Sequence, residues 1–256
     1  MTQDDPIYIL PFFEEFFRDA GKDFEIVMVS SCQVMGKRSR RKLLGELWQL
    51  YGPVGFVRLL SRAATMRATG FFPRTREAAH FGTLKQLCRS YGMPFQRLGN
   101  PNSPEYLQEL KDRNPDVLVS VACPYILKEP LLKLPPLGCI NIHHAPLPRY
   151  KGMMPTFWQM YHGERKVGVT VHYMAPKVDD GAPLLQEELE ILPGESLDHL
   201  IRRSKRHGAH CMAKVLRQMA TGTQKILQWN TNESSIFTFP TAAEIREFQR
   251  RGFRAS

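Results

Sequence analysis

Residues 103–123, SPEYLQELKDRNPDVLVSVAC, contain a helix that is followed directly by a strand. Ser103 is a good N-cap, and the proline after it suits the first helical position. An Asn-Pro pair then ends the helix, and the short apolar run at 116–123 is typical of a buried strand. This stretch predicts one helix-strand unit of an α/β protein.

Further helices and strands are predicted on both sides of this unit. The predicted helices span residues 11–20, 41–70 with a break at Gly52 and Pro53, 83–91 and 196–219. The predicted strands span residues 24–31, 94–98, 138–143, 167–174 and 184–191. Alternation of helices and apolar strands is typical of an α/β fold with a mostly parallel sheet flanked by helices.

Residues 223–256 differ in character from the rest of the chain. They contain a predicted strand at 225–229, a polar turn, a second apolar run at 236–239 and a short helix that starts near Thr241. An independent domain of this size would be marginal. We therefore predict a main domain at residues 1–222 and a C-terminal hairpin and helix extension at residues 223–256.

Composition places the chain among ordinary globular proteins. It has 256 residues, of which 43% are hydrophobic and 23% charged. No window approaches the roughly 18 consecutive apolar residues of a membrane span, and the acidic N-terminus does not resemble a signal peptide. The five cysteines are scattered and lack CxxC spacing. These features predict a cytoplasmic protein with no membrane partner, no disulfide framework and no metal site.

The net charge of +10 is concentrated in clusters, of which one lies at residues 37–42 and another at 202–206. Such clusters attract anions, for example nucleic acid or a phosphorylated small molecule, but they are also typical of solvated helix faces. Both interpretations stay open. An apolar stripe of the helix at 41–70 is interpreted as packing rather than as a cofactor site: Leu43, Leu44, Leu47 and Leu50.

The segment CINIHHAPLPRYKG at 139–152 combines a strand with polar residues at its end. Alternation along the strand places Asn141 and His143 on one face, at the carboxyl end where open α/β sheets bind ligands. A second polar segment, KVDDG at 177–181, could bring a carboxylate to His143 and orient its ring. Satisfied polar groups at a sheet edge are the alternative, and His144 and His172 are interpreted as packing residues.

These motifs resemble those of the folate-dependent formyltransferases, which include glycinamide ribonucleotide, methionyl-tRNA and nucleotide-sugar enzymes. That family has an Asn-x-His, a Leu-Pro turn, a Gly and an Asp in a Val/Leu-Asp-x-Gly loop. The corresponding residues here are Asn141, His143, Leu147, Pro148, Gly152 and the segment 178–181. The resemblance is strong from about residue 116 to residue 186.

The resemblance implies a Rossmann-like fold and the transfer of a formyl group from 10-formyltetrahydrofolate to an amine. Its catalytic residues would be Asn141, His143 and Asp179. An amide donor such as that of Asn141 stabilises the oxygen that becomes negative, and a carboxylate such as Asp179 moves protons. The donor would be bound by an apolar loop and by residues before the catalytic Asp: Pro124, Tyr125, Ile126, Leu127, Lys177 and Val178.

Three departures from the family pattern affect the local structure. Asp180 stands where the family has a small hydroxylated residue, and Ala145 replaces a serine. The family also begins with a hydrophobic strand, whereas this chain opens on MTQDDP. Either residues 7–10 supply that strand, or the chain starts late.

The acceptor is predicted to be a small-molecule amine, such as a nucleotide-linked amino sugar. Family members that act on tRNA have a larger C-terminal domain, and those of the purine pathway have a Gly-rich loop where this chain is acidic. A nucleic-acid partner is therefore disfavoured, and self-association as a homodimer stays open. The alternatives are a methionyl-tRNA formyltransferase-like enzyme, a hydrolase that releases formate, and a scaffold or nucleic-acid-binding protein that has lost catalysis.

Overall fold

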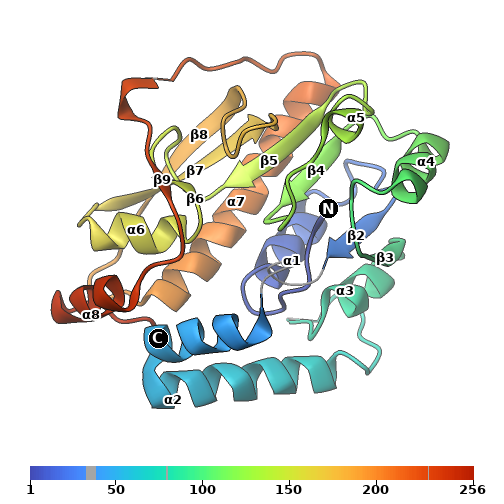
Figure 1. Cartoon of the computed structure of the whole chain (residues 1–256). Helices are drawn as coiled ribbons and strands as arrows, with labels where there is room; N and C mark the ends of the chain where they lie inside the picture. Colours follow the sequence, from blue (N-terminus) through green and yellow to red (C-terminus); the bar gives the residue numbers. More distant parts are fainter. Residues whose placement is uncertain (33–38, 79, 230) are drawn as a thin grey trace.

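The structure is a computed structural model that describes residues 1–32, 39–78, 80–229 and 231–256. A seven-stranded sheet forms its centre, with the strand order β3-β2-β1-β4-β5-β7-β8 (Figure 1). The first five strands of this order are parallel to one another. Strand β7 runs antiparallel to β5, and β8 runs antiparallel to β7. The predicted mostly parallel α/β fold is confirmed. The strands are β1 (Thr2–Gln3), β2 (Val29–Cys32), β3 (Phe95–Leu98), β4 (Leu118–Val121), β5 (Cys139–His143), β7 (Lys166–Tyr173) and β8 (Pro183–Glu190).

Helices cover both faces of the sheet. Neighbouring residues of a strand point to opposite faces, and accordingly Ile140 packs with helices α1 and α7 whereas Cys139 packs with α4 and α5. Among the described residues, no helix combines the length and apolar character that a membrane crossing requires. The helices are α1 (Leu10–Asp19), α2 (Arg40–Thr69), α3 (Leu84–Ser90), α4 (Pro104–Arg113), α5 (Glu129–Leu132), α6 (Pro155–Tyr161), α7 (Leu197–Ala220) and α8 (Ala242–Arg250).

The helix-strand unit predicted from residues 103–123 is present as α4 and β4. The Ser103 side chain accepts a hydrogen bond from the backbone N–H of Tyr106 at 3.3 Å, as expected of an N-cap. Asn114 ends the helix in the left-handed region, with φ of 45°. These contacts involve neighbouring residues only, and the sequence pattern predicts them for that reason.

The first strand is formed by residues that the sequence did not indicate. Thr2 pairs with Ser31 of β2 and with Val121 of β4, so that β1 completes the centre of the sheet. The alternative in which residues 7–10 supply this strand is wrong. The Asp5 carboxylate accepts hydrogen bonds from the backbone N–H groups of Ile7 and Tyr8, which turns the chain into α1 instead.

Helix α2 has the break that the sequence predicts. Gly52 has φ of 64° and ψ of 177°, outside the helical region, and it divides α2 into two halves. The halves run side by side as a helical hairpin along the lower edge of the molecule in Figure 1. Lys37 and Arg38, which belong to the predicted basic cluster before this helix, lie outside the described residues.

The C-terminal residues differ from their predicted arrangement. Residues 225–229 form no strand, and β9 (Ile236–Phe237) pairs in parallel with β6 (Lys151–Gly152). The predicted hairpin is therefore wrong, because the partner of β9 comes from the middle of the chain. The predicted helix is confirmed as α8, whose N-terminus has a capping box formed by Thr241 and Glu244.

Candidate active site

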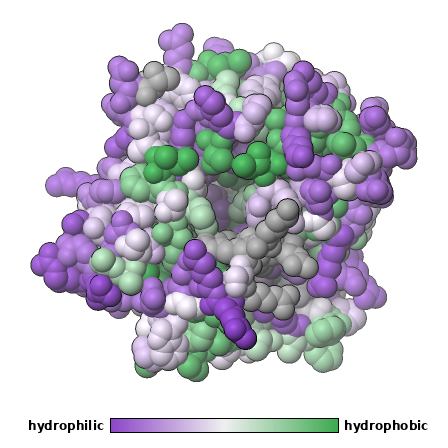
Figure 2. Space-filling view, viewed as in Figure 1, coloured by the Kyte–Doolittle hydropathy of each residue, from purple (hydrophilic) through white to green (hydrophobic). Residues whose placement is uncertain are grey.

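Asn141, His143 and Asp179 meet around one cavity. The first two lie on β5, and Asp179 lies in the loop between β7 and β8. All three line a cavity of about 770 Å³, which is within the range of roughly 300 to 1,000 Å³ typical of small-molecule sites. The space-filling view shows a hollow near the middle of this face (Figure 2). The fold thus brings together the three side chains that the sequence singled out.

The His143 ring is held between a backbone carbonyl and the Asp179 carboxylate. Its Nε2 donates a hydrogen bond to the carbonyl oxygen of Tyr150 at 2.8 Å, and its Nδ1 lies 3.5 Å from Oδ2 of Asp179. Because Nε2 carries a proton, Nδ1 of the neutral ring has a lone pair and can receive a second proton. The protonated ring would then donate to both partners. This arrangement suits a group that accepts and returns a proton during a reaction.

The Asp179 carboxylate is held by the backbone of Gly152. The N–H of Gly152 donates a hydrogen bond to Oδ2 of Asp179 at 2.9 Å. Gly152 has φ of 91°, and a Cβ at this position would lie 2.3 Å from the carbonyl oxygen of Phe237. A side chain would therefore push the backbone away from β9 and from Asp179. This contact explains why a glycine is needed at residue 152.

Asn141 is oriented by His172, which lies opposite it on β7. The Nδ1–H of His172 donates to the carbonyl oxygen of Tyr173 at 2.7 Å, so Nε2 accepts a hydrogen bond from Nδ2 of Asn141 at 3.2 Å. Burial lowers the pKa of His172 to about 4, against the opposing effect of the Asp179 carboxylate. The ring is therefore neutral near pH 7. His172, predicted to be a packing residue, thus also positions the Asn141 amide.

We expect protonation of His172 to destabilise the fold in mild acid. Its pKa is about 4 in the folded state, below the usual value of 6.5, so between these values the unfolded state binds more protons. The free energy of unfolding should fall as the pH falls through this window. Urea unfolding at about pH 7 and about pH 5 measures this change, which should be smaller for His172→Gln than for the wild type. An equal change in both proteins would contradict the expectation.

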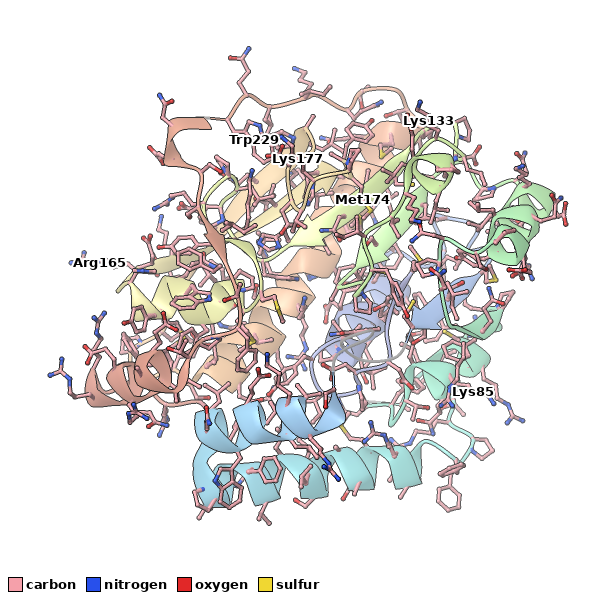
Figure 3. The ribbon with its side chains drawn as sticks, in the orientation of Figure 1. Lys85, Lys133, Arg165, Met174, Lys177 and Trp229 are labelled. Carbon is pink, nitrogen blue, oxygen red and sulfur yellow. The ribbon has the colours of Figure 1, made fainter. Side chains whose placement is uncertain are left out.

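The predicted donor-binding residues line the same cavity. The loop after β4 contributes four of them, Pro124 to Leu127, and the segment after β7 contributes Lys177 and Val178. Figure 3 shows Lys177 close to Met174, which directly follows β7 and also lines the cavity. The two segments are far apart in the sequence, but the strands that precede them, β4 and β7, are separated in the sheet only by β5.

Two of the three departures from the family pattern, Asp180 and Ala145, make polar contacts of their own. Asp180 forms an ion pair with Lys151, and its carboxylate is directed at that ammonium group rather than at His143. The carbonyl oxygen of Ala145 accepts a hydrogen bond from the Thr170 hydroxyl at 2.7 Å. Neither residue takes part in the contact between His143 and Asp179.

The cavity has a wall that the sequence analysis did not recognise. Leu43, Leu47 and Leu50 of α2 line it, although they were interpreted as packing residues. An apolar stripe at helical spacing is the same whether it faces a core or a ligand cavity. The distinction depends on how the helical hairpin lies against the sheet, and no signal in the sequence reveals that.

A buried acid-base group also lines the cavity, on the side of α1 and α7. Lys205 was part of a cluster for which a solvated helix face was one interpretation, yet it is only 9% exposed, and burial lowers its pKa to about 7. Burial raises the pKa of Asp5, which lines the cavity as well. His144, interpreted as a packing residue, is buried and joined to the Ser204 hydroxyl at 2.8 Å. These groups give the cavity polar contacts beyond the three predicted residues.

Similar proteins of known function are formyltransferases. A family model described as formyl transferase matches residues 74–216. The methionyl-tRNA formyltransferase of Syntrophus aciditrophicus is 39% identical over 134 residues, which are 52% of this chain and 43% of that protein. That of Trichlorobacter lovleyi is 34% identical over 139 residues, 54% of this chain and 44% of that protein. The matched region thus spans less than half the length of these relatives.

Solved structures of similar proteins have the same fold. The phosphoribosylglycinamide formyltransferase from Anaplasma phagocytophilum has a TM-score of 0.61 and 18% identity, over 94% of this chain and 96% of that chain. WlaRD, a sugar 3N-formyltransferase, has a TM-score of 0.56 and 14% identity, over 99% of this chain and 80% of that chain. The family match extends over more than half of the chain and includes Asn141, His143 and Asp179. This chain therefore belongs to the formyl transferase family.

Proposed function

We propose that this protein transfers the formyl group of 10-formyltetrahydrofolate to a primary amine, and that Asn141, His143 and Asp179 carry out the transfer. One observation carries the proposal: these three side chains line a single cavity, with the His143 ring between a backbone carbonyl and the Asp179 carboxylate. A proton acceptor and an amide donor beside one cavity suit attack on a carbonyl carbon.

Each group has a distinct task in the proposed reaction. The Asn141 amide, oriented by His172, donates a hydrogen bond to the formyl oxygen as it gains negative charge. His143 and Asp179 share the proton that the attacking amine loses, and they return it to the departing folate nitrogen. Gly152 keeps the carboxylate in place throughout. No covalent bond between protein and substrate is needed.

The donor is bound, in this proposal, by the loop from Pro124 to Leu127 together with Lys177 and Val178. Formyl-tetrahydrofolate is the donor in this family, and the similar structure of WlaRD was determined in the presence of 5-N-formyl-THF. The residues present fit such a ligand, because apolar side chains of the loop line a cavity large enough for a flat ring system. The Lys177 ammonium would attract the carboxylates of a folate.

The acceptor in this proposal is a small amine, of the class of nucleotide-linked amino sugars. The cavity supports a small acceptor, because Asp5 and Lys205 place a carboxyl and an amine inside it for recognition of a polar ligand. A second candidate acceptor is the amine of an aminoacyl-tRNA. The observation in its favour is that the curated relatives named above are methionyl-tRNA formyltransferases.

A transfer assay tests the function and separates the acceptors. The protein is incubated with 10-formyltetrahydrofolate and, separately, nucleotide-linked amino sugars, other small amines and methionyl-tRNA, while folate absorbance and formate are followed. Folate turnover that depends on a small amine supports the proposal, and turnover with methionyl-tRNA alone supports the second candidate. Formate release without any amine would identify a hydrolase. No folate turnover under any condition, with a folded protein, would overturn the function.

The division of the chain is proposed as well: a catalytic domain at residues 1–222 and an extension at residues 223–256. The extension packs against the domain. Phe248 of α8 is fully buried and stacks on Phe157 of α6, with 4.6 Å between ring centroids. Its role in this proposal is to support the segment that holds Gly152, through the pairing of β9 with β6.

A further inference from the structure

The α2 hairpin exposes a large apolar surface. Of fourteen exposed large hydrophobic side chains among the described residues, seven lie between residues 44 and 72. We define the hairpin surface by six of them: Leu44 (45% exposed), Trp48 (48%), Val54 (74%), Val57 (62%), Phe71 (85%) and Phe72 (68%). Four of them lie on α2, and Phe71 and Phe72 directly follow it. Such a concentration of exposed apolar side chains is typical of an interaction surface.

The outer face of the second half of α2 joins these side chains. Val57, Ser61, Ala64 and Ala68 recur at helical spacing, and all four are exposed. The Trp48 ring from the first half contacts Phe56 of the second half edge-on, with 5.4 Å between centroids. Residues of this half extend over about 25 Å at the usual helical rise. Hydrophobic side chains lie along the lower edge of Figure 2, where Figure 1 places the hairpin.

The same segment carries more than half of the net positive charge of the chain. Residues 41–76 contain seven basic residues and one acidic residue, Glu46, which is +6 of the net charge of +10. Arg41, Lys42 and Arg58 are exposed and have no ion-pair partner among the described residues. The hairpin therefore combines exposed apolar and aromatic side chains with unpaired cations.

We propose that the hairpin surface docks this protein onto the surface of an anionic lipid bilayer. A helix with an apolar face and flanking Lys and Arg lies in the plane of the interface, with its apolar side chains among the acyl chains and its cations near anionic headgroups. Trp, Phe and Leu side chains are typical of the apolar face of such helices. The docking is peripheral, and it revises the expectation of no membrane partner, because only the fold shows that these side chains are exposed together.

Charge and side-chain type favour the bilayer over other occupants. Two copies of the hairpin surface would each bring +6 to a shared interface and repel one another. Nucleic acid would match the charge, but aliphatic side chains such as Leu44, Val54 and Val57 gain little against a phosphate backbone. A bilayer matches both properties. The opposite side of the hairpin lines the cavity, so docking would place that cavity beside the lipid surface.

Co-sedimentation with vesicles tests the docking without folate or acceptor, so its outcome is independent of the proposed function. The full chain is mixed with vesicles of phosphatidylcholine alone or with phosphatidylglycerol added. We expect binding only to the anionic vesicles, with a blue shift of the Trp48 fluorescence. The variants V57D/F72D and R41E/R58E should each bind at least about tenfold more weakly. Each places two negatively charged side chains against the anionic headgroups. Trp48→Phe should keep binding and lose the shift.

Matched controls place the same changes elsewhere on the exposed surface. L192D/I226D and K225E/R246E should bind vesicles as the wild type does, and far-UV circular dichroism should show that all variants are folded. Failure to bind anionic vesicles, or unchanged binding of both hairpin variants, would overturn the proposal. Binding of RNA that is lost in R41E/R58E but kept in V57D/F72D, without vesicle binding, would identify a nucleic-acid surface instead. A dimer that V57D/F72D dissociates, again without vesicle binding, would identify a self-interface.

Discussion

Asp179→Asn is expected to lower kcat for formyl transfer by about 10²- to 10⁴-fold, the usual contribution of a positioned proton-transfer group. The amide oxygen can still accept the hydrogen bond from Gly152, so the loop should keep its shape. The amide cannot accept the proton or stabilise a protonated His143 ring, which lies 3.5 Å from the carboxylate. Steady-state kinetics with the acceptor found in the assay above measure the change.

Asp180→Asn is the matched control for this variant. Asp180 is the next residue along the chain, and its carboxylate pairs with Lys151 instead of approaching His143. Its kcat should stay close to that of the wild type. The combined variant Asp179→Asn with His143→Gln adds a second test, since residues that act as one unit are strongly non-additive. A double variant much slower than either single variant, or a fast Asp179→Asn, would contradict the shared proton.

Asn141→Ala is expected to lower kcat by about 10²- to 10³-fold, as the loss of one oxyanion donor does in other enzymes. KM should change little, because the hydrogen bond strengthens only when the formyl oxygen becomes negative. The amide is already fixed by His172 at 3.2 Å, so the donor needs no reorganisation during the reaction. The separate measurement of kcat and KM for each substrate distinguishes this role from ground-state binding.

Ser120→Ala provides the corresponding control. Ser120 pairs with Asn141 across β4 and β5, lines the same cavity and is 2% exposed, so its replacement also removes a polar group from the site. Its kcat should fall far less than that of Asn141→Ala. Similar losses in the two variants would indicate a general disturbance of the cavity. A rise in KM at constant kcat for Asn141→Ala would assign the amide to substrate binding alone.

Local patterns account for the parts of the site that the sequence predicts. Asn141 and His143 alternate on one strand, and the strand geometry places them on the same face without reference to the rest of the chain. The segment 177–181 is confined between two strands that the hydrophobic pattern indicates. Because β5 pairs with β7, the loop that follows β7 brings Asp179 close to His143 at the end of β5.

Long-range packing accounts for the parts that the sequence analysis missed. The partner of Asn141 is His172, and only the antiparallel register of β5 and β7 sets that pair. Lys205 lies in a run of basic residues that resembles a solvated face, yet α7 turns it towards the cavity. Strand β1 has two residues, too few for a hydrophobic pattern, and it is held by pairing on both sides.

The sequence by itself determined the unit of α4 and β4 with its N-cap at Ser103, the cap of α8 and the alternation of Asn141 and His143 on β5, because these depend on residues close together in the chain. The tertiary structure alone decided which side chains of α2 line the cavity and which are exposed, and it paired β9 with β6. Burial and strand pairing join residues that are distant in the sequence. Such contacts stabilise the fold without producing a pattern in any short stretch of sequence.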